Sequence, residues 1–335
     1  MPMTGANGGL IGTDNTPAAA GDGCVTAITS TGCFCSSSTH ATVIVVAGGG
    51  GAGRSGGGGG GGAVVVACHP LPGSAIPVTI GAGGAGSGPT VGATGSDSVF
   101  GSTTSITAKG GGGGGGENNA SNAGTSGGSG GGGGCDGSAV MGAAVATNHG
   151  CTRAGFSGGK GDHATGGGGG GAGGSGGKRG PAGMGACLLP LGIPKCAGEK
   201  GFVGGGGSGL DNNTASDAND AILAGPTARA ATDTRSAPLA SNNSKHFGGI
   251  GGGGASLITS PRFNPATPDC NASNATAGTA NTGGGGGANG SPTAFAGQAG
   301  GSGVIFVVKP GAATINSGIY NIKEQYAAIR GSRWI

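Results

Sequence analysis

The chain has 335 residues, of which 92 are glycine and 16 are proline, whereas charged residues make up 9% and aromatic residues 3%. The formal net charge of +3 is small for this length, so charge gives no reason to expect nucleic acid or an anionic membrane as a partner. Ordinary disordered chains combine low hydrophobicity with a high net charge, and this chain lacks the charge. We therefore expect an ordered chain that does not bind nucleic acid.

No targeting or membrane-spanning segment is expected. Met1–Thr4 lack the basic start and the following apolar run of a secretory signal. The longest apolar runs, such as Ala41–Ala47 and Ala63–Cys68, are far too short to span a bilayer. We expect soluble synthesis in a cytoplasm and no insertion into a membrane.

Short segments rich in β-branched residues and bounded by glycine or proline predict strands. They are Thr42–Val46, Ala63–Ala67, Ala75–Ile80, Ser105–Ala108 and Gly303–Val308. Pro77 cannot donate a ladder hydrogen bond, which predicts that its strand lies at a sheet edge or on a bulge. No stretch before residue 318 shows a helical period. We therefore predict a mainly β fold, with a small antiparallel β-sandwich or jelly-roll-like core and long loops.

Glycine is concentrated in runs that alternate with these strands. The runs are Gly48–Gly51, Gly56–Gly62, Gly110–Gly116, Gly130–Gly134, Gly166–Gly171, Gly204–Gly207, Gly251–Gly254 and Gly283–Gly287. A glycine run can form an extended threefold helix that rises about 3.1 Å per residue without internal hydrogen bonds. Several such helices can pack closely and pair their free N–H and C=O groups with one another. This arrangement is a polyglycine II helix bundle.

The alternative is that the runs are flexible linkers, because glycine loses more conformational freedom on folding than any other residue. The alternation with strands and the purity of the runs favour the packed bundle. The residues that interrupt the runs, Ala52, Ser55, Ala172 and Ser175, are expected at the bundle surface.

The chain has nine cysteines, an odd number, so at least one is unpaired or pairs with another chain. No CxxC pair occurs, which favours disulfides or buried thiols over a metal site. Cys187 with Cys196 and Cys135 with Cys151 are the best local candidates for disulfides, because each pair closes a short loop. The full connectivity stays open.

Nothing in the sequence predicts catalysis, a metal site or a cofactor. The five histidines are scattered, and no nucleophile elbow, zinc-protease helix or calcium loop is present. Strings of the form GxGxxG carry no information in a chain so rich in glycine. We expect that the protein is not an enzyme.

The order of elements carries a resemblance. A Pro-containing strand leads to Val78–Gly84, then Gly95–Gly101 follows, Thr107–Lys109 runs into Gly110–Gly116, and Gly301–Val308 closes the series. This order resembles the glycine-rich domain found in tail and appendage proteins of bacteriophages, over about residues 41–309.

The two ends also resemble the flanking pieces of phage virion proteins. They are Gly8–Pro17 and Ser317–Trp334, the second reading SGIYNIKEQYAAIRGSRW. The resemblance implies three parts: an N-terminal docking segment (1–40), the glycine-rich domain (41–309) and a C-terminal docking tail (310–335).

The tail has the composition of an interface, because it contains both tyrosines and the only tryptophan of the chain. Ile322, Tyr326 and Ile329 would share one face of a two-turn helix. Tyr, Trp and Arg are common interface anchors, which adds Tyr320, Arg330 and Trp334 to the predicted assembly interface. The alternative is a tail that packs on its own domain.

Three polar stretches between glycine runs, Glu117–Gly127, Gly209–Asn243 and Asn264–Thr282, are candidate recognition loops at the tips of the bundle. The predicted function is a phage virion structural protein, in a tail fibre, appendage or adhesin that binds a host-cell receptor. Its expected partners are other virion proteins, and its expected state is a homotrimer. The alternatives are a head-decorating fibre of the capsid and, in a different class, a polyglycine II ice-binding protein, which has no use for the end motifs.

Overall fold

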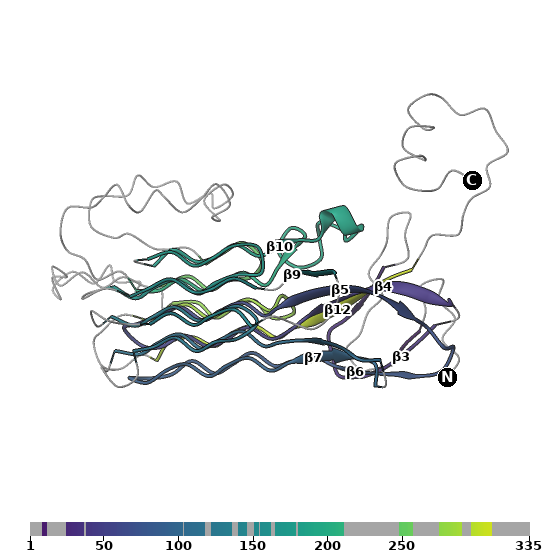
Figure 1. Cartoon of the computed structure of the whole chain (residues 1–335), viewed down its shortest axis with the longest axis horizontal. Helices are drawn as coiled ribbons and strands as arrows, with labels where there is room; N and C mark the ends of the chain where they lie inside the picture. The colour runs from purple at the N-terminus through teal and green to yellow at the C-terminus, as the bar shows by residue number, and fades with distance from the viewer. Residues whose placement is uncertain are drawn as a thin grey trace, which may run out of the picture.

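The computed structural model describes residues 9–11, 25–36, 38–102, 104–117, 122–135, 140–145, 151–153, 155–161, 165–178, 180–210, 248–256, 275–289 and 296–309. Two β-sheets lie at one end of this part of the chain, and long extended segments run side by side away from them (Figure 1). Within it no helix is long and apolar enough to cross a membrane.

The prediction of a mainly β fold is confirmed. One five-stranded sheet has the order β1 (Gly9–Ile11), β3 (Gly32–Cys35), β6 (Ile76–Thr79), β7 (Ser98–Phe100) and β8 (Ile106–Ala108). The other has the order β2 (Val25–Ile28), β12 (Val304–Val308), β4 (His40–Val46), β5 (Val64–Pro70) and β9 (Cys151–Arg153). All the strand pairings within both sheets are antiparallel.

The main hydrophobic core contains side chains from both five-stranded sheets, as expected of a sandwich. Phe34 of β3 and Phe100 of β7 are fully buried, with ring centroids 5.9 Å apart. They share one cluster with Val43 and Val45 of β4 and with Ile305 of β12. Since successive strand residues point to opposite faces, this cluster uses only alternate residues of β4.

The opposite face of β4 is buried as well. Ile44 and Val46 belong to a second cluster with Phe306, Leu188 and Val203. Its outer wall comes from a segment that contains β10 (Ala186–Cys187), the 3-10 helix η1 (Leu189–Leu191) and β11 (Phe202–Val203). Burial on both faces explains why Val43–Val46 of β4 are all apolar rather than alternating with polar residues.

Two sequence-based expectations need correction. Strand β6 lies inside its sheet, between β3 and β7, and not at an edge. Pro77 lies just beyond the paired end of β7 at Phe100. Its carbonyl still accepts from Gly101 N–H (2.9 Å), so proline costs this position only the donated bond. In addition, β1, β2 and β3 fall within the predicted docking segment 1–40 but are strands of the two sheets. The sheets therefore include residues that the sequence assigned to docking.

The glycine runs are held by hydrogen bonds that repeat every three residues. In run 47–53, Gly48 N–H donates to Ser96 O (3.1 Å), and three residues later Gly51 N–H donates to Ala93 O (2.9 Å). The intervening N–H groups donate to two other segments, 57–63 and 298–301. Three more segments donate to the carbonyls of this run: 84–87, 111–114 and Gly286. This is the hydrogen-bond pattern that packed threefold glycine helices require, although the helical conformation of each run stays a prediction.

At most interior positions of this bundle only glycine fits. Gly59 donates its N–H to Gly286 O (2.9 Å), and its carbonyl accepts from Gly207 N–H (2.8 Å). A Cβ atom added to Gly59 would lie 2.1 Å from Gly50 O. Most glycines of the described runs meet a neighbouring main chain at similar distances. The absence of side chains is therefore what allows the segments to approach and to satisfy one another's main-chain groups.

The residues that interrupt the runs are not all at the bundle surface, as the sequence had suggested. Ala52 and Ala172 are fully buried, and Ser55 is 8% exposed, whereas Ser175 is exposed. The expectation was wrong for the first three, because a small side chain also fits where the packing of the runs leaves room for it. In the structure, runs 47–53 and 166–172 lie in its interior.

Candidate binding tip

The bundle has a free end, which we call the bundle tip and define by Arg54, Ser55, Gly88, Glu117, Cys135, Leu210, Ser256 and Asn289. The chain path places these residues away from the sheets. Run 47–53 continues β4, and run 56–62 leads back into β5. The Arg54–Ser55 turn between them therefore lies at the end of the bundle away from the sheets. Runs that continue β6, β8 and β11 reach the same end at Gly88, Glu117 and Leu210.

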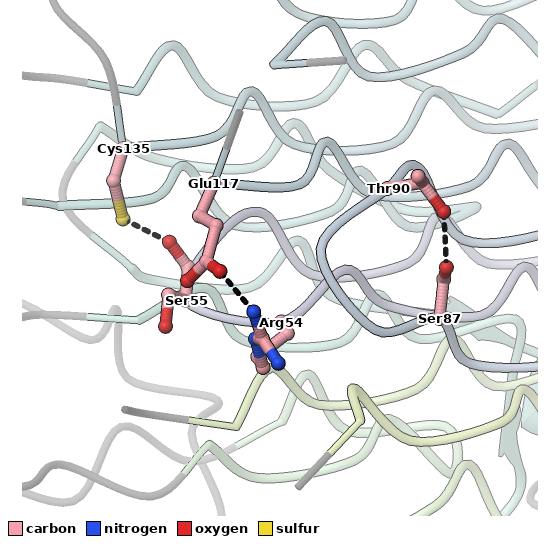
Figure 2. A network of polar contacts seen from close by, with 6 residues as sticks. All are labelled: Arg54, Ser55, Ser87, Thr90, Glu117 and Cys135. Carbon is pink, nitrogen blue, oxygen red and sulfur yellow. Dashed lines mark hydrogen bonds and ion pairs between the residues drawn. The ribbon is translucent and has the colours of Figure 1, made fainter. Parts of the chain in front are cut away.

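Polar contacts connect the ends of several runs at the tip (Figure 2). The Arg54 guanidinium forms an ion pair with the Glu117 carboxylate, and both side chains are partly buried. The thiol of Cys135 donates to the carbonyl oxygen of Ser55. The main-chain N–H of Ser55 donates to Asn289 O (2.7 Å). The central turn is thereby fastened to three other run ends.

A small apolar cluster lies beneath these contacts. Leu210, 1% exposed, packs with Ala52 and Ala288, which are fully buried, and with Cys135. It is separate from the two clusters at the sheets. The tip therefore has its own small core.

The described ends of the domain lie at the opposite end from the tip. Strand β12 leaves the bundle, so Lys309 lies beyond the sheets. Strand β1 is antiparallel to β3, which is antiparallel to β6, and β6 leads into the bundle. Gly9, at the start of β1, therefore also lies at the sheet end.

The predicted assembly interface, Tyr320, Ile322, Tyr326, Ile329, Arg330 and Trp334, lies outside the described residues. The same holds for most of the predicted recognition loops. The described run ends that border these loops, Glu117, Leu210 and Ser256, lie at the tip. The described parts of two of these stretches, 122–127 and 275–282, are not tip loops, because they run along the bundle and form main-chain hydrogen bonds with its other segments. For these parts the expectation was wrong.

The cysteine pairings stay predictions. Cys187 and Cys196 carry free thiols in this structure. Cys135 uses its thiol in the contact with Ser55, and the side chain of Cys151 lies outside the described residues. Among the side chains that the structure describes, no group of three or more His, Cys, Asp or Glu is placed to hold a metal ion.

A family model described as a glycine-rich domain matches residues 25–309. The chain belongs to this glycine-rich domain family. The match begins at β2 and ends just after β12, so the glycine-rich domain comprises the bundle and every strand of both sheets except β1. No curated protein matches the chain. The family match supports the glycine-rich part of the resemblance, whereas a bacteriophage origin stays a prediction.

Sequence reasoning missed Arg54, Asn289 and Leu210 as residues that build the tip. A signal was present, because each follows a glycine run directly or closely. A large or polar residue at the end of a run marks the point where the chain leaves the close packing. In this glycine-rich domain such residues indicate where the bundle ends.

Proposed function

We propose that this glycine-rich domain protein is a structural component of a bacteriophage particle, in a tail fibre, appendage or adhesin. The sheet end attaches to the particle, and the bundle tip faces the host cell. The observation that carries the proposal is the opposite placement of Gly9 and Lys309 at one end and the tip at the other. A domain held at one end can present the other to a surface.

The chain outside the described domain supplies the attachment in this proposal. The residues before Gly9 and after Lys309 continue from the sheet end, where the tail residues Tyr326 and Trp334 would contact other virion proteins. The bundle is held by main-chain hydrogen bonds along its length, so it can serve as a stiff spacer. The polar loops that border the tip provide the contact with a host receptor.

We further propose a homotrimer. Four large apolar side chains are exposed among the described residues: Val140, Met141, Val145 and Phe156. They lie on adjoining runs, since Gly158 N–H donates to Gly142 O (3.1 Å). Exposed apolar patches favour contact with another protein surface, and copies of the same chain would cover this flank.

Two measurements test the proposal. Mass spectrometry of purified particles should detect the chain, and the purified full-length protein should bind host cells and block their infection. A head-decorating fibre would be detected on the capsid and would leave adsorption unchanged. Absence from particles together with thermal hysteresis of the soluble protein would refute the proposal in favour of an ice-binding protein.

A further inference from the structure

The side chain of Asn289 connects three segments at the bundle tip. It is 1% exposed. Its Oδ1 accepts from Ala275 N–H (3.1 Å) and its Nδ2 donates to Ala296 O (3.0 Å). Its main-chain carbonyl accepts from Ser55 N–H (2.7 Å).

The two partners of the carboxamide have particular places in the chain. Ala275 is the first described residue after segment 257–274, and Ala296 is the first after segment 290–295. Each therefore begins a described segment of the bundle. One amide group thus fixes the starts of two bundle segments relative to the central Arg54–Ser55 turn.

The chemistry of this position requires an amide of this length. The side chain has to accept at one end and donate at the other, and both partners are main-chain groups. A carboxylate of the same shape would accept from Ala275 but would place a second acceptor against the Ala296 carbonyl. Leaving a buried polar group without a partner is costly.

We propose that Asn289 is the positioning residue of the bundle tip, which sets the relative placement of the chain on either side of segments 257–274 and 290–295. This inference rests on the proposed function, because it makes Asn289 a determinant of the shape that the tip presents to a host receptor. The residue acts through the segments that it fixes and need not touch the receptor.

The test uses the full-length protein with Asn289→Asp and the matched control Asn281→Asp. Asn281 lies in the turn before run 283–287, at the sheet end of the bundle, and its Oδ1 accepts from Ser302 Oγ (3.2 Å). An aspartate there keeps the acceptor. We expect Asn289→Asp to weaken host-cell binding by about tenfold or more at pH 8, and Asn281→Asp to bind like the wild type.

A pH series separates positioning from general damage. A protonated carboxyl again has an acceptor and a donor, so Asn289→Asp should recover binding as the pH falls, relative to the wild type at each pH. Burial raises the pKa of the introduced carboxyl. Arg54 and Glu117, the charged neighbours at the tip, are present in both the wild type and the variant. The wild-type pH series therefore shows how much of any change in binding comes from them.

Hydrogen exchange supplies a readout that does not depend on a receptor. In Asn289→Asp at pH 8 the amides near residues 275 and 296 should lose protection, while run 47–53 keeps it. If the amides near residues 275 and 296 exchange in this variant at the wild-type rate, the inference is overturned. It is also overturned if protection falls equally throughout the bundle. If the wild type does not bind cells but the local loss occurs, the proposed function fails and the positioning role stands.

Discussion

Replacing one interior glycine by alanine tests whether close main-chain packing holds the bundle together. In Gly59→Ala the new Cβ would start 2.1 Å from Gly50 O and 2.7 Å from Gly50 C. Real Cβ contacts are essentially never under 3.0 Å, so the neighbouring run must move by about 1 Å. Gly50 itself donates to Gly60 O (2.8 Å) and accepts from Gly286 N–H (2.9 Å), so its movement disturbs both bonds.

The size of the effect follows from these contacts. Disrupting two or three hydrogen bonds at roughly 0.5–1.5 kcal/mol each costs about 1–4.5 kcal/mol. Alanine restricts the unfolded chain and offsets this by about 0.4–1 kcal/mol. From the middle of these ranges we expect Gly59→Ala to lower the free energy of unfolding by about 2 kcal/mol and the Tm by roughly 4–8 °C.

Two control variants separate the causes of this loss. A Cβ on Gly88 meets no atom within 4 Å, so Gly88→Ala should be neutral or slightly stabilising. Gly192 also has open space but a φ of 79°, so Gly192→Ala should cost only about 1 kcal/mol through backbone strain. Calorimetric unfolding of the three variants measures the differences. Equal stability of Gly59→Ala and Gly88→Ala would refute the reasoning.

Three further outcomes are expected. Leu210→Ala removes the largest side chain of the tip cluster and should cost about 2–3 kcal/mol, measured by urea unfolding; a loss below 0.5 kcal/mol would show that this cluster contributes no stability. Phe156→Ser should weaken self-association in sedimentation while changing stability by less than about 0.5 kcal/mol, and an unchanged mass distribution would exclude this flank as the contact. Oxidation should join Cys187 to Cys196 and add about 2–3 kcal/mol, which peptide mapping with and without reductant can check; no such peptide under oxidising conditions would reject the pairing.

The strands were predictable because their side chains carry the information. Strands β4, β5 and β12 are β-branched segments with sharp glycine boundaries, and the structure has them nearly where the sequence predicts. Strand β3 was missed because Gly32–Cys35 offers one large buried side chain, Phe34, between two cysteines. Strand β7, with only Val99 and Phe100 as large residues, was too short to stand out from its glycine-rich surroundings.

The arrangement of the bundle could not be predicted from the sequence. A glycine run has no side chains that distinguish one neighbour from another, so nothing in the sequence shows that run 47–53 lies between segments as distant as 84–87 and 298–301. These neighbours follow from the strands to which each run is connected. The tip was therefore predictable only as a place where loops gather, and the roles of Asn289 and the Arg54–Glu117 pair were not.

Residue-resolved amide hydrogen exchange of the native protein tests the central claim, that the glycine runs form an ordered bundle through mutual main-chain hydrogen bonds. The interior segments 47–53, 57–62 and 166–172 should exchange as slowly as strand β4, because each N–H has a main-chain acceptor away from water. Exchange of these glycines at the rate of an unfolded chain, with β4 still protected, would contradict the account.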